Sequence, residues 1–290
     1  MARILVTGAS GFIGGTLVRA LQARGDTVVR VLRHPPAGAR DVLQADFASV
    51  PGRDWWQPRL AGIDAVVNAV GILREDRQRS FRALHTEAPA ELFHACAAAG
   101  VPVVVQVSSL GSDENGFTAY QRSKKAADDV LRSLPLAGAV VQPSAVYGPG
   151  GSSTAMFNTM ARAPVLALPD GGRMAMQPVH VADVVAGILA VLDAPPKPVR
   201  TLHFAGPEAM PFREFLARLR AALGVRSPLR TLPLPAPLFR LGASLAGLVP
   251  ASPLDADTAA MLLAGSRTDQ NALPALLGHA PRAVEAFVAG

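Results

Sequence analysis

The sequence predicts an α/β protein built on a doubly wound parallel sheet, with a small, mostly helical C-terminal subdomain. Short apolar runs alternate with longer segments of helical periodicity, which is the pattern of strand–helix–strand units. A glycine-rich turn with Gly8, Gly11 and Gly14 separates the first apolar run from the first helical pattern. A chain of 290 residues, 50% hydrophobic and 17% charged, is long enough for one large core with a subdomain attached.

The predicted elements follow this alternation along the chain. The strand runs are rich in valine, isoleucine and leucine, and the helical segments repeat apolar residues three and four positions apart. The expected strands lie near 3–7, 27–32, 42–45, 65–69, 103–107, 139–142 and 200–204. The expected helices lie near 12–24, 80–99, 117–133, 181–193 and 212–223.

The regular alternation lapses after about Gly150. We expect a helix near 154–162 there, then an extended linker from Pro228 to Pro237 and an amphipathic segment from Leu238 to Val249. The chain therefore divides into a sheet domain over 1–150, completed by about 177–205, and a subdomain over 151–176 and 206–290. Methionine, leucine and phenylalanine side chains in the two excursions predict an apolar substrate pocket: Met156, Phe157, Met160, Met174, Met176, Leu238 and Phe239.

The first turn has the chemistry of a pyrophosphate site. Backbone N–H groups at the start of a helix carry partial positive charge, and side chains at Gly8, Gly11 and Gly14 would obstruct the phosphates. The preceding strand and following helix supply the context that a glycine pattern needs to be informative.

A second signal is the spacing between Tyr120 and Lys124. The chain has two tyrosines and only three lysines, and residues four apart lie on one face of a helix. A phenol titrates near pH ~10, and an adjacent ammonium favours the phenolate, which promotes proton exchange with a carbonyl or alcohol. The structural alternative is a surface lysine beside a packed tyrosine.

Together these motifs resemble the short-chain dehydrogenase/reductase superfamily, in its extended or atypical branch, and imply a Rossmann-type fold. The resemblance spans the chain and includes Thr7–Gly14, Asn68–Gly71, Val107–Ser109, Pro143–Gly148 and Val179–Asp183. Within this NAD-dependent epimerase/dehydratase-like group, three phrases are similar to the accessory subunit of respiratory complex I and its bacterial relatives. They are Asn68–Leu73, Val107–Gly111 and Leu276–Pro281.

The resemblance implies roles for individual residues. Tyr120 would be the general acid/base, Lys124 would hold the nicotinamide ribose and lower the tyrosine pKa, and Ser109 would bind the substrate oxygen, with Ser108 as the alternative. Residues expected to contact the cofactor, besides Tyr120 and Lys124, are Gly8, Ser10, Gly11, Phe12, Ile13, Gly14, Arg33, Asp46, Phe47, Asn68, Ala69, Val70, Gly71, Pro143, Ser144 and Val146.

The end of the second strand favours NADP over NAD. NAD-selective sites place a carboxylate there for the ribose 2′-hydroxyl, whereas this chain has Arg33, whose guanidinium can grip a 2′-phosphate. The alternative is that Arg33 only faces solvent.

Two positions depart from the family pattern. His85 stands where extended members often place asparagine, and Gln142 stands where an arginine usually precedes the proline, which argues against a sugar nucleotide. We predict an NAD(P)-dependent oxidoreductase acting on a small or hydrophobic carbonyl or alcohol. The alternatives are an NAD-dependent sugar-nucleotide epimerase or dehydratase, and a non-catalytic NADP(H)-binding structural or assembly subunit.

Composition limits the remaining classes. The chain has a net charge of +6, and almost all of its positive side chains are arginines spread along the sequence. Aromatic residues make up only 5%. Both features argue against nucleic acid binding. The single cysteine, Cys96, excludes an internal disulfide, and the histidines lack metal-ligand spacing, so we expect no metal. We expect a cytoplasmic monomer or homodimer without a transmembrane segment, with residues 238–249 as the alternative docking helix for a membrane or protein complex.

Overall fold

The computed structural model describes residues 1–246 and 255–288, and it contains a seven-stranded sheet with the order β11-β6-β5-β4-β1-β2-β3. The pairings from β3 through β6 are parallel, and the order reverses between β1 and β4, as in a Rossmann-type doubly wound sheet. The strands are β1 (Arg3–Thr7), β2 (Thr27–Leu32), β3 (Val42–Gln44), β4 (Ala65–Asn68), β5 (Val103–Val107), β6 (Ala137–Pro143) and β11 (Arg200–Phe204).

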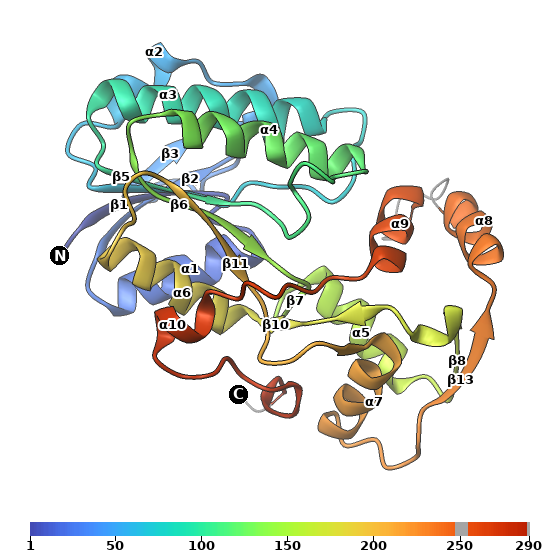
Figure 1. Cartoon of the computed structure of the whole chain (residues 1–290). Coiled ribbons are helices and arrows are strands. Elements are labelled where there is room, and N and C mark those ends of the chain that lie inside the picture. Colours follow the sequence, from blue (N-terminus) through green and yellow to red (C-terminus); the bar gives the residue numbers. More distant parts are fainter. Residues whose placement is uncertain (247–254, 289–290) are drawn as a thin grey trace. The chain divides into compact units, whose positions relative to one another are not determined.

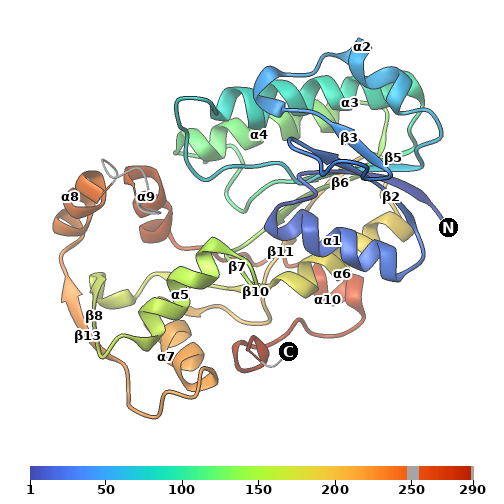
Figure 2. The ribbon, with the colours of Figure 1, turned by 180° about the vertical axis from the view of Figure 1, so that it is seen from behind.

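Helices cover both faces of this sheet (Figures 1 and 2). One face carries α3 and α4, with the short α2 at its edge, and the other carries α1 and α6. These helices are α1 (Phe12–Ala23), α2 (Arg53–Trp56), α3 (Ala88–Ala99), α4 (Ala119–Ser133) and α6 (Val181–Asp193). The predicted fold class is therefore confirmed.

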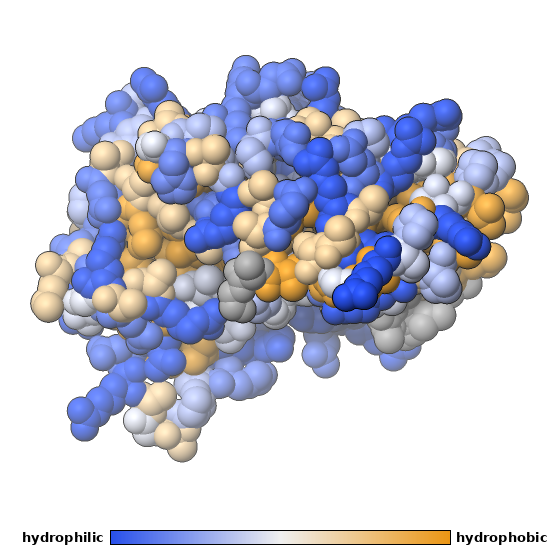
Figure 3. All heavy atoms as spheres, turned by 90° about the horizontal axis from the view of Figure 1, so that it is seen from below, coloured by the Kyte–Doolittle hydropathy of each residue, from blue (hydrophilic) through white to orange (hydrophobic). Residues whose placement is uncertain are grey.

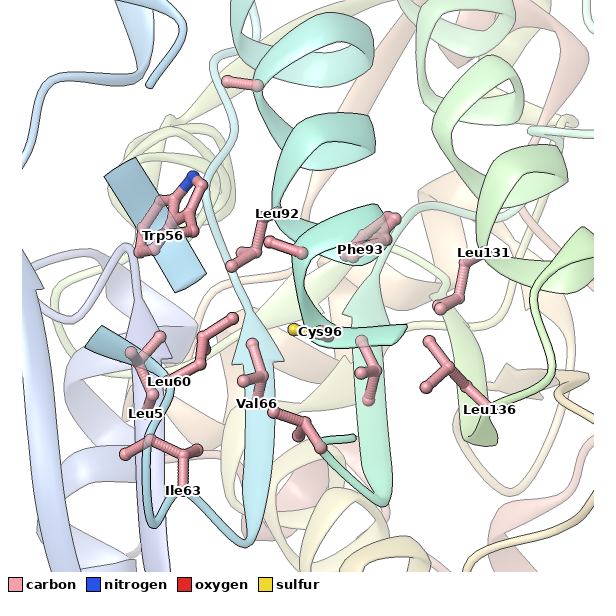
Figure 4. Close-up of a cluster of buried hydrophobic side chains, with 14 of the residues drawn as sticks. Leu5, Trp56, Leu60, Ile63, Val66, Leu92, Phe93, Cys96, Leu131 and Leu136 are labelled. Atoms are coloured by element: carbon pink, nitrogen blue, oxygen red, sulfur yellow. The ribbon is translucent and has the colours of Figure 1, made fainter. Parts of the chain in front are cut away.

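The core under α3 and α4 explains why these helices form. Figure 4 shows Leu92, Phe93 and Cys96 of α3 pointing toward Val66 of the sheet, and Leu131 of α4 lies on the same side. These side chains are fully buried. Burial raises the pKa of the Cys96 thiol to about 12, so this cysteine behaves as a small core residue, as its apolar surroundings in the sequence predict.

The chain divides into two compact units. The first comprises residues 1–142 and 184–202, and the second comprises 143–183 and 203–290. The second unit contains α5 (Ser152–Arg162), α7 (Phe212–Ala222), α8 (Ala236–Ala246), α9 (Ala256–Ala264) and α10 (Leu273–Leu277). Its strands are β7 (Val146–Tyr147), β8 (Val165–Pro169), β9 (Ala175–Met176), β10 (Val179–His180), β12 (Met210–Pro211) and β13 (Arg230–Leu234).

The second unit has its own hydrophobic core. Phe157 of α5 meets Phe215 of α7 edge-on, with the ring centroids 5.2 Å apart, and Met174 and Met176 are buried in the same cluster. Several side chains that the sequence assigns to a substrate pocket therefore stabilise this unit. The pocket itself stays a prediction.

Several segments differ from the sequence-based expectation. The helix expected at 80–99 opens with a wider π-helical segment, η3 (Arg82–Glu87), before α3. The expected linker from Pro228 to Pro237 contains β13, which pairs in parallel with β8, and no helix was expected at α9. The amphipathic segment forms α8 as far as Ala246, and its residues 247–249 lie outside the described part of the chain.

Candidate active site in the first unit

The glycine turn between β1 and α1 has no room for side chains. Gly8 has a φ of +64°, and a Cβ there would lie 2.5 Å from the Ala69 carbonyl oxygen. A Cβ on Gly14 would lie 2.2 Å from the Gly8 oxygen. Gly11 begins α1 without a side-chain cap, and the first turn carries no acidic residue. This cradle fits a pyrophosphate, because the backbone N–H groups of the turn and their partial positive charge are not matched by a protein anion.

A pocket of about 430 Å³ follows the ends of β2 and β3. Arg33 and Asp46 both line it, and both side chains are exposed. The Asp46 carboxylate accepts a hydrogen bond from the Ala48 backbone N–H, 3.0 Å away. Phe47 instead packs in the core against Trp56, with the ring centroids 6.0 Å apart, so only its backbone is available to an adenine. The complete lining is Arg33, His34, Gln44, Ala45, Asp46, Ser49, Pro51, Gly52 and Trp55.

A buried polar row crosses the sheet behind the glycine turn. Thr7, Asn68 and Gln106 stand side by side on β1, β4 and β5. The Thr7 hydroxyl donates to the Asn68 side-chain oxygen, and the Asn68 amide donates to Gln106 at 2.6 Å. Asn68 is fully buried. It therefore fixes the start of the Ala69–Gly71 loop, and any contact with a cofactor would come from the loop backbone.

Tyr120 and Ser109 come together at the end of β5. The tyrosine lies in the first turn of α4, which Thr118 and Gln121 close with a capping box, and the serine is the second residue after the end of β5. Burial raises the pKa of the Tyr120 phenol, its hydrogen bond with the Ser109 side chain lowers it, and the Asp128 charge raises it. The net shift is upward, so the phenol is protonated near neutral pH.

The structure separates the two adjacent serines. Ser108 is buried, and its hydroxyl donates to the Asp128 carboxylate at 2.6 Å. Ser109 is only partly buried, and its hydroxyl lies 2.9 Å from that of Ser112. Ser109 therefore has the accessible hydroxyl, while Ser108 is tied into the core.

Lys124 lies under the loop after β4. Its ammonium donates to the carbonyl oxygens of Val107, at 3.0 Å, and Val70, at 3.3 Å. Burial lowers the pKa of Lys124 to about 8, although the Asp128 charge raises it. The largest cause of the raised Tyr120 pKa is burial, and Lys124 is not among its causes, so the expected lowering of the tyrosine pKa by the lysine stays a prediction.

His85 is a neutral link between the loop and α4. Its Nε2 accepts a hydrogen bond from the Ile72 N–H at 3.0 Å, and its Nδ1 lies 3.0 Å from the Ser123 hydroxyl. Since Nε2 accepts, the neutral ring carries its proton on Nδ1 and donates to Ser123, which donates in turn to the Tyr120 carbonyl. Burial, followed by the Lys124 charge, lowers the His85 pKa to about 2. Both ring nitrogens are occupied by these contacts, so His85 serves to join the loop after β4 to α4.

Gln142 and Asp128 complete a buried cluster that the sequence did not reveal. The Gln142 amide donates to the Ser112 carbonyl at 2.9 Å and lies 3.4 Å from Asp128. Asp128 is four residues after Lys124, so helical spacing was the signal that would have found it. Burial raises the Asp128 pKa to about 6, with Ser108 and Lys124 opposing. Gln142 is thereby held in the core and unavailable to a sugar nucleotide.

The remaining predicted site residues belong to the second unit. Pro143 ends β6, the Ser144 hydroxyl donates to the Gln177 carbonyl at 2.5 Å, and Val146 begins β7. Their place beside a nicotinamide stays a prediction. In the described residues no helix is long and apolar enough to cross a membrane, and no group of three metal-ligating side chains comes together.

A family model for the NAD dependent epimerase/dehydratase family matches residues 4–202. The chain therefore belongs to this family, whose members bind a nicotinamide dinucleotide. Two solved structures show the same fold. MoeE5 in complex with UDP-glucose and NAD has a TM-score of 0.72 and 22% identity, covering 99% of this chain and 96% of that one. The human epimerase family protein SDR39U1 with NADPH has a TM-score of 0.72 and 20% identity, covering 99% of each chain.

Curated relatives include enzymes and a respiratory-chain subunit. A ceramide reductase of Caulobacter vibrioides is 32% identical over 66% of this chain and 61% of its own length. A 3-diazoavenalumate denitrifying reductase of a Streptomyces species is 30% identical over 80% of this chain and 84% of its own. The mitochondrial NADH dehydrogenase 1 alpha subcomplex subunit 9 of Dictyostelium discoideum is 26% identical over 73% of this chain and 61% of its own. The chain thus spans about three fifths of the ceramide reductase and of the respiratory subunit.

Proposed function

We propose that this family member is a reductase of hydrophobic carbonyl compounds that uses NADPH. The observation that carries the proposal is the position of Tyr120 in the first turn of α4 with the Ser109 side chain acting on it, and with Lys124 buried one helical turn further along α4. A phenol with a raised pKa is protonated near neutral pH, and this is the form that donates a proton to a carbonyl oxygen.

Each residue of the site has a definite task in this proposal. Tyr120 donates a proton to the carbonyl oxygen of the substrate, and Ser109 donates a hydrogen bond to the same oxygen. Lys124 holds the loop after β4 through the Val70 carbonyl and presents its ammonium toward the cofactor ribose. A nicotinamide held at this site would supply the hydride that reduces the carbonyl carbon. The Gly8–Gly14 turn would hold the pyrophosphate, and Arg33 would hold the 2′-phosphate.

Two features support reduction of an apolar substrate. Relatives with 30% identity or more include proteins named as reductases, one of them a ceramide reductase. The buried Gln142 leaves no arginine at the position where sugar-nucleotide enzymes use one. The resemblance to a respiratory subunit keeps one competing function, which is a subunit that holds the dinucleotide without turnover.

The test combines cofactor binding with turnover. Purified protein is titrated with NADPH and NADH, and oxidation of NADPH is then followed with long-chain keto lipids, hydrophobic ketones, aldehydes, quinones and UDP-sugars. We expect tighter binding of NADPH and turnover of an apolar carbonyl. Tyr120→Phe should lower turnover by about 100-fold or more without weakening NADPH binding.

Tyr147 is the matched control, since it is the other tyrosine of the chain and its hydroxyl donates to Asn158 in the second unit at 2.9 Å. Tyr147→Phe should retain turnover. NADPH binding without turnover of any compound in the panel would identify the non-catalytic subunit. Interconversion of UDP-sugars would identify an epimerase.

A further inference from the structure

We propose that one face of the second unit docks on an anionic lipid bilayer. This docking face is formed by β13, α8 and the turn before β13. Figure 3 shows apolar residues at the right-hand edge of the molecule, on the side where Figure 1 places α8. These segments carry four leucines, each 57–59% exposed, and three exposed arginines, of which Arg240 lies on the flank of α8 beside the leucine row: Leu232, Leu238, Leu241, Leu245, Arg226, Arg230 and Arg240.

Helix α8 has two apolar faces, of which only one is used for packing. Ala243 is fully buried, and α8 lies against α9. Successive helical residues turn by about 100°, so Leu238, Leu241 and Leu245 fall within an arc of about 60° on another side of the helix. A row of large apolar side chains in water is unfavourable unless another surface covers it.

Strand β13, which precedes α8, also exposes leucine and arginine side chains. Arg230 and Leu232 are two residues apart on β13, so their side chains share one face of the β8–β13 pair. Val165 stands opposite Arg230 on β8 and is 47% exposed. The strand and the helix thus both combine exposed aliphatic residues with arginine.

Charge identifies the occupant as an anionic surface. No aspartate or glutamate occurs between Glu214 and Asp255, while five arginines do. Two of them are used inside the unit, since Arg218 pairs with Glu214 and Arg220 donates to the carbonyl oxygens of Ala161 and Ala163. The three arginines of the docking face make no ion pair within the described residues.

A bilayer fits this combination better than a second copy of the chain does. Leucines on a helix lying in the interface reach the acyl boundary, and arginines beside them reach the lipid phosphates. A symmetric dimer through the same face would bring the arginines of two copies together, and like charges repel. The docking face therefore favours phosphate headgroups over self-association.

The experiment is cosedimentation of the full chain with two kinds of vesicle. One is phosphatidylcholine alone, and the other is an equimolar mixture of phosphatidylcholine and phosphatidylglycerol. We expect binding to the mixed vesicles to be at least about tenfold stronger, and to weaken with added salt because screening reduces exposed charge interactions. Replacement of Leu238, Leu241 and Leu245 by serine should abolish binding. Replacement of the three arginines by glutamine should bring binding down to the level seen with phosphatidylcholine.

Leu73→Ser is the matched control, because Leu73 is 51% exposed in the first unit and outside the docking face. It should bind like the unmodified chain. A separate reporter, Leu241→Trp, should show a blue shift of its fluorescence with the mixed vesicles only.

Two results would overturn the proposal. One is equal binding of the leucine variant and the unmodified chain, with no fluorescence shift in the reporter. The other is a dimer in solution that dissociates in the leucine variant while no variant sediments with vesicles. NADPH oxidation is not needed for either readout, so failure here leaves the proposed reductase activity untouched.

Discussion

The two compact units bury their polar side chains in different ways. In the first unit most buried polar side chains bond to one another, as Asn68 does with Gln106 and Ser108 with Asp128, although Lys124 donates only to backbone carbonyls. In the second unit they bond mainly to backbone, as Ser144 does with the Gln177 carbonyl and Arg220 with the Ala161 carbonyl. Bonds to backbone carbonyls hold loops in place. Bonds between side chains build a network whose members can change charge or partner.

The first unit also leaves polar atoms unpaired. Buried atoms without a partner in the described protein are Trp56 Nε1, Gln106 Nε2, Asp128 Oδ1 and Gln142 Oε1, and all four lie in this unit. An unsatisfied buried group costs about 1–3 kcal/mol. Two of these residues, Asp128 and Gln142, belong to the cluster behind Ser109 and Lys124. The first unit therefore keeps hydrogen-bonding capacity beside its candidate site, whereas no buried side-chain atom of this kind occurs in the described part of the second unit.

The largest expected effect is the loss of unfolding free energy when a buried phenylalanine is removed from the core of either unit. Phe93 in the first unit and Phe215 in the second are both fully buried. Phe→Ala at either position should reduce the free energy of unfolding by about 3–5 kcal/mol, because it leaves a cavity. At a temperature where both variants remain folded, Phe215→Ala should keep the NADPH affinity of the unmodified chain. Thermal unfolding and NADPH titration measure the two quantities. Loss of NADPH affinity in folded Phe215→Ala would break the assignment of the dinucleotide site to the first unit.

The next prediction concerns the pH dependence of stability. The Asp128 pKa is raised from 3.8 to about 6 in the folded protein. The folded state therefore binds more protons than the unfolded state in this window, and stability falls as pH rises from about 4 to 6. One pKa unit corresponds to about 1.4 kcal/mol, so the change is about 3 kcal/mol at most. Asp128→Asn should remove this loss, which denaturant unfolding across the same pH range will show.

Asp129 provides a matched control for that variant. It is the next residue of α4, exposed, and paired with Lys125 at 2.7 Å. Asp129→Asn should keep the pH dependence of the unmodified protein. Identical pH profiles for Asp128→Asn and the unmodified protein would show that Asp128 is not the group whose protonation stabilises the fold at low pH.

Local sequence patterns predict most of the strands and helices. The elements that the sequence did not predict depend on contacts between distant segments. The strands and the glycine turn depend on alternation and on Gly8 and Gly14, which are visible in a short window of sequence. The pairing of β13 with β8 joins segments more than 60 residues apart, so no local pattern indicates it. Proline at 233 and 235 favoured a linker, yet the strand forms at an edge, where a missing N–H is tolerated.

The candidate site shows the same difference between features that a local sequence pattern indicates and features that depend on tertiary packing. The spacing of Tyr120 and Lys124 correctly indicated one helix, but the direction of the tyrosine pKa shift depends on burial, which the spacing does not contain. The tie between Ser108 and Asp128 likewise requires β5 and α4 to be packed together. Residue type and order therefore predicted which groups occur near the site, and tertiary packing determined their protonation.

The smallest expected effect concerns Arg33, an exposed residue just after the end of β2 in the first unit. Arg33 is exposed and lines the 430 Å³ pocket after β2 and β3, where the Asp46 carboxylate accepts a hydrogen bond from the Ala48 backbone N–H. A hydrogen bond to a charged group contributes about 1.5–3 kcal/mol, so Arg33→Gln should weaken NADPH binding by about tenfold or more. NADH lacks the 2′-phosphate and should bind the variant as it binds the unmodified chain. Parallel titrations with the two dinucleotides give the measurement and its internal control together. Equal weakening of NADPH and NADH would mean that Arg33 shapes the pocket without recognising the phosphate, and no weakening of either would leave it as a solvent-facing arginine.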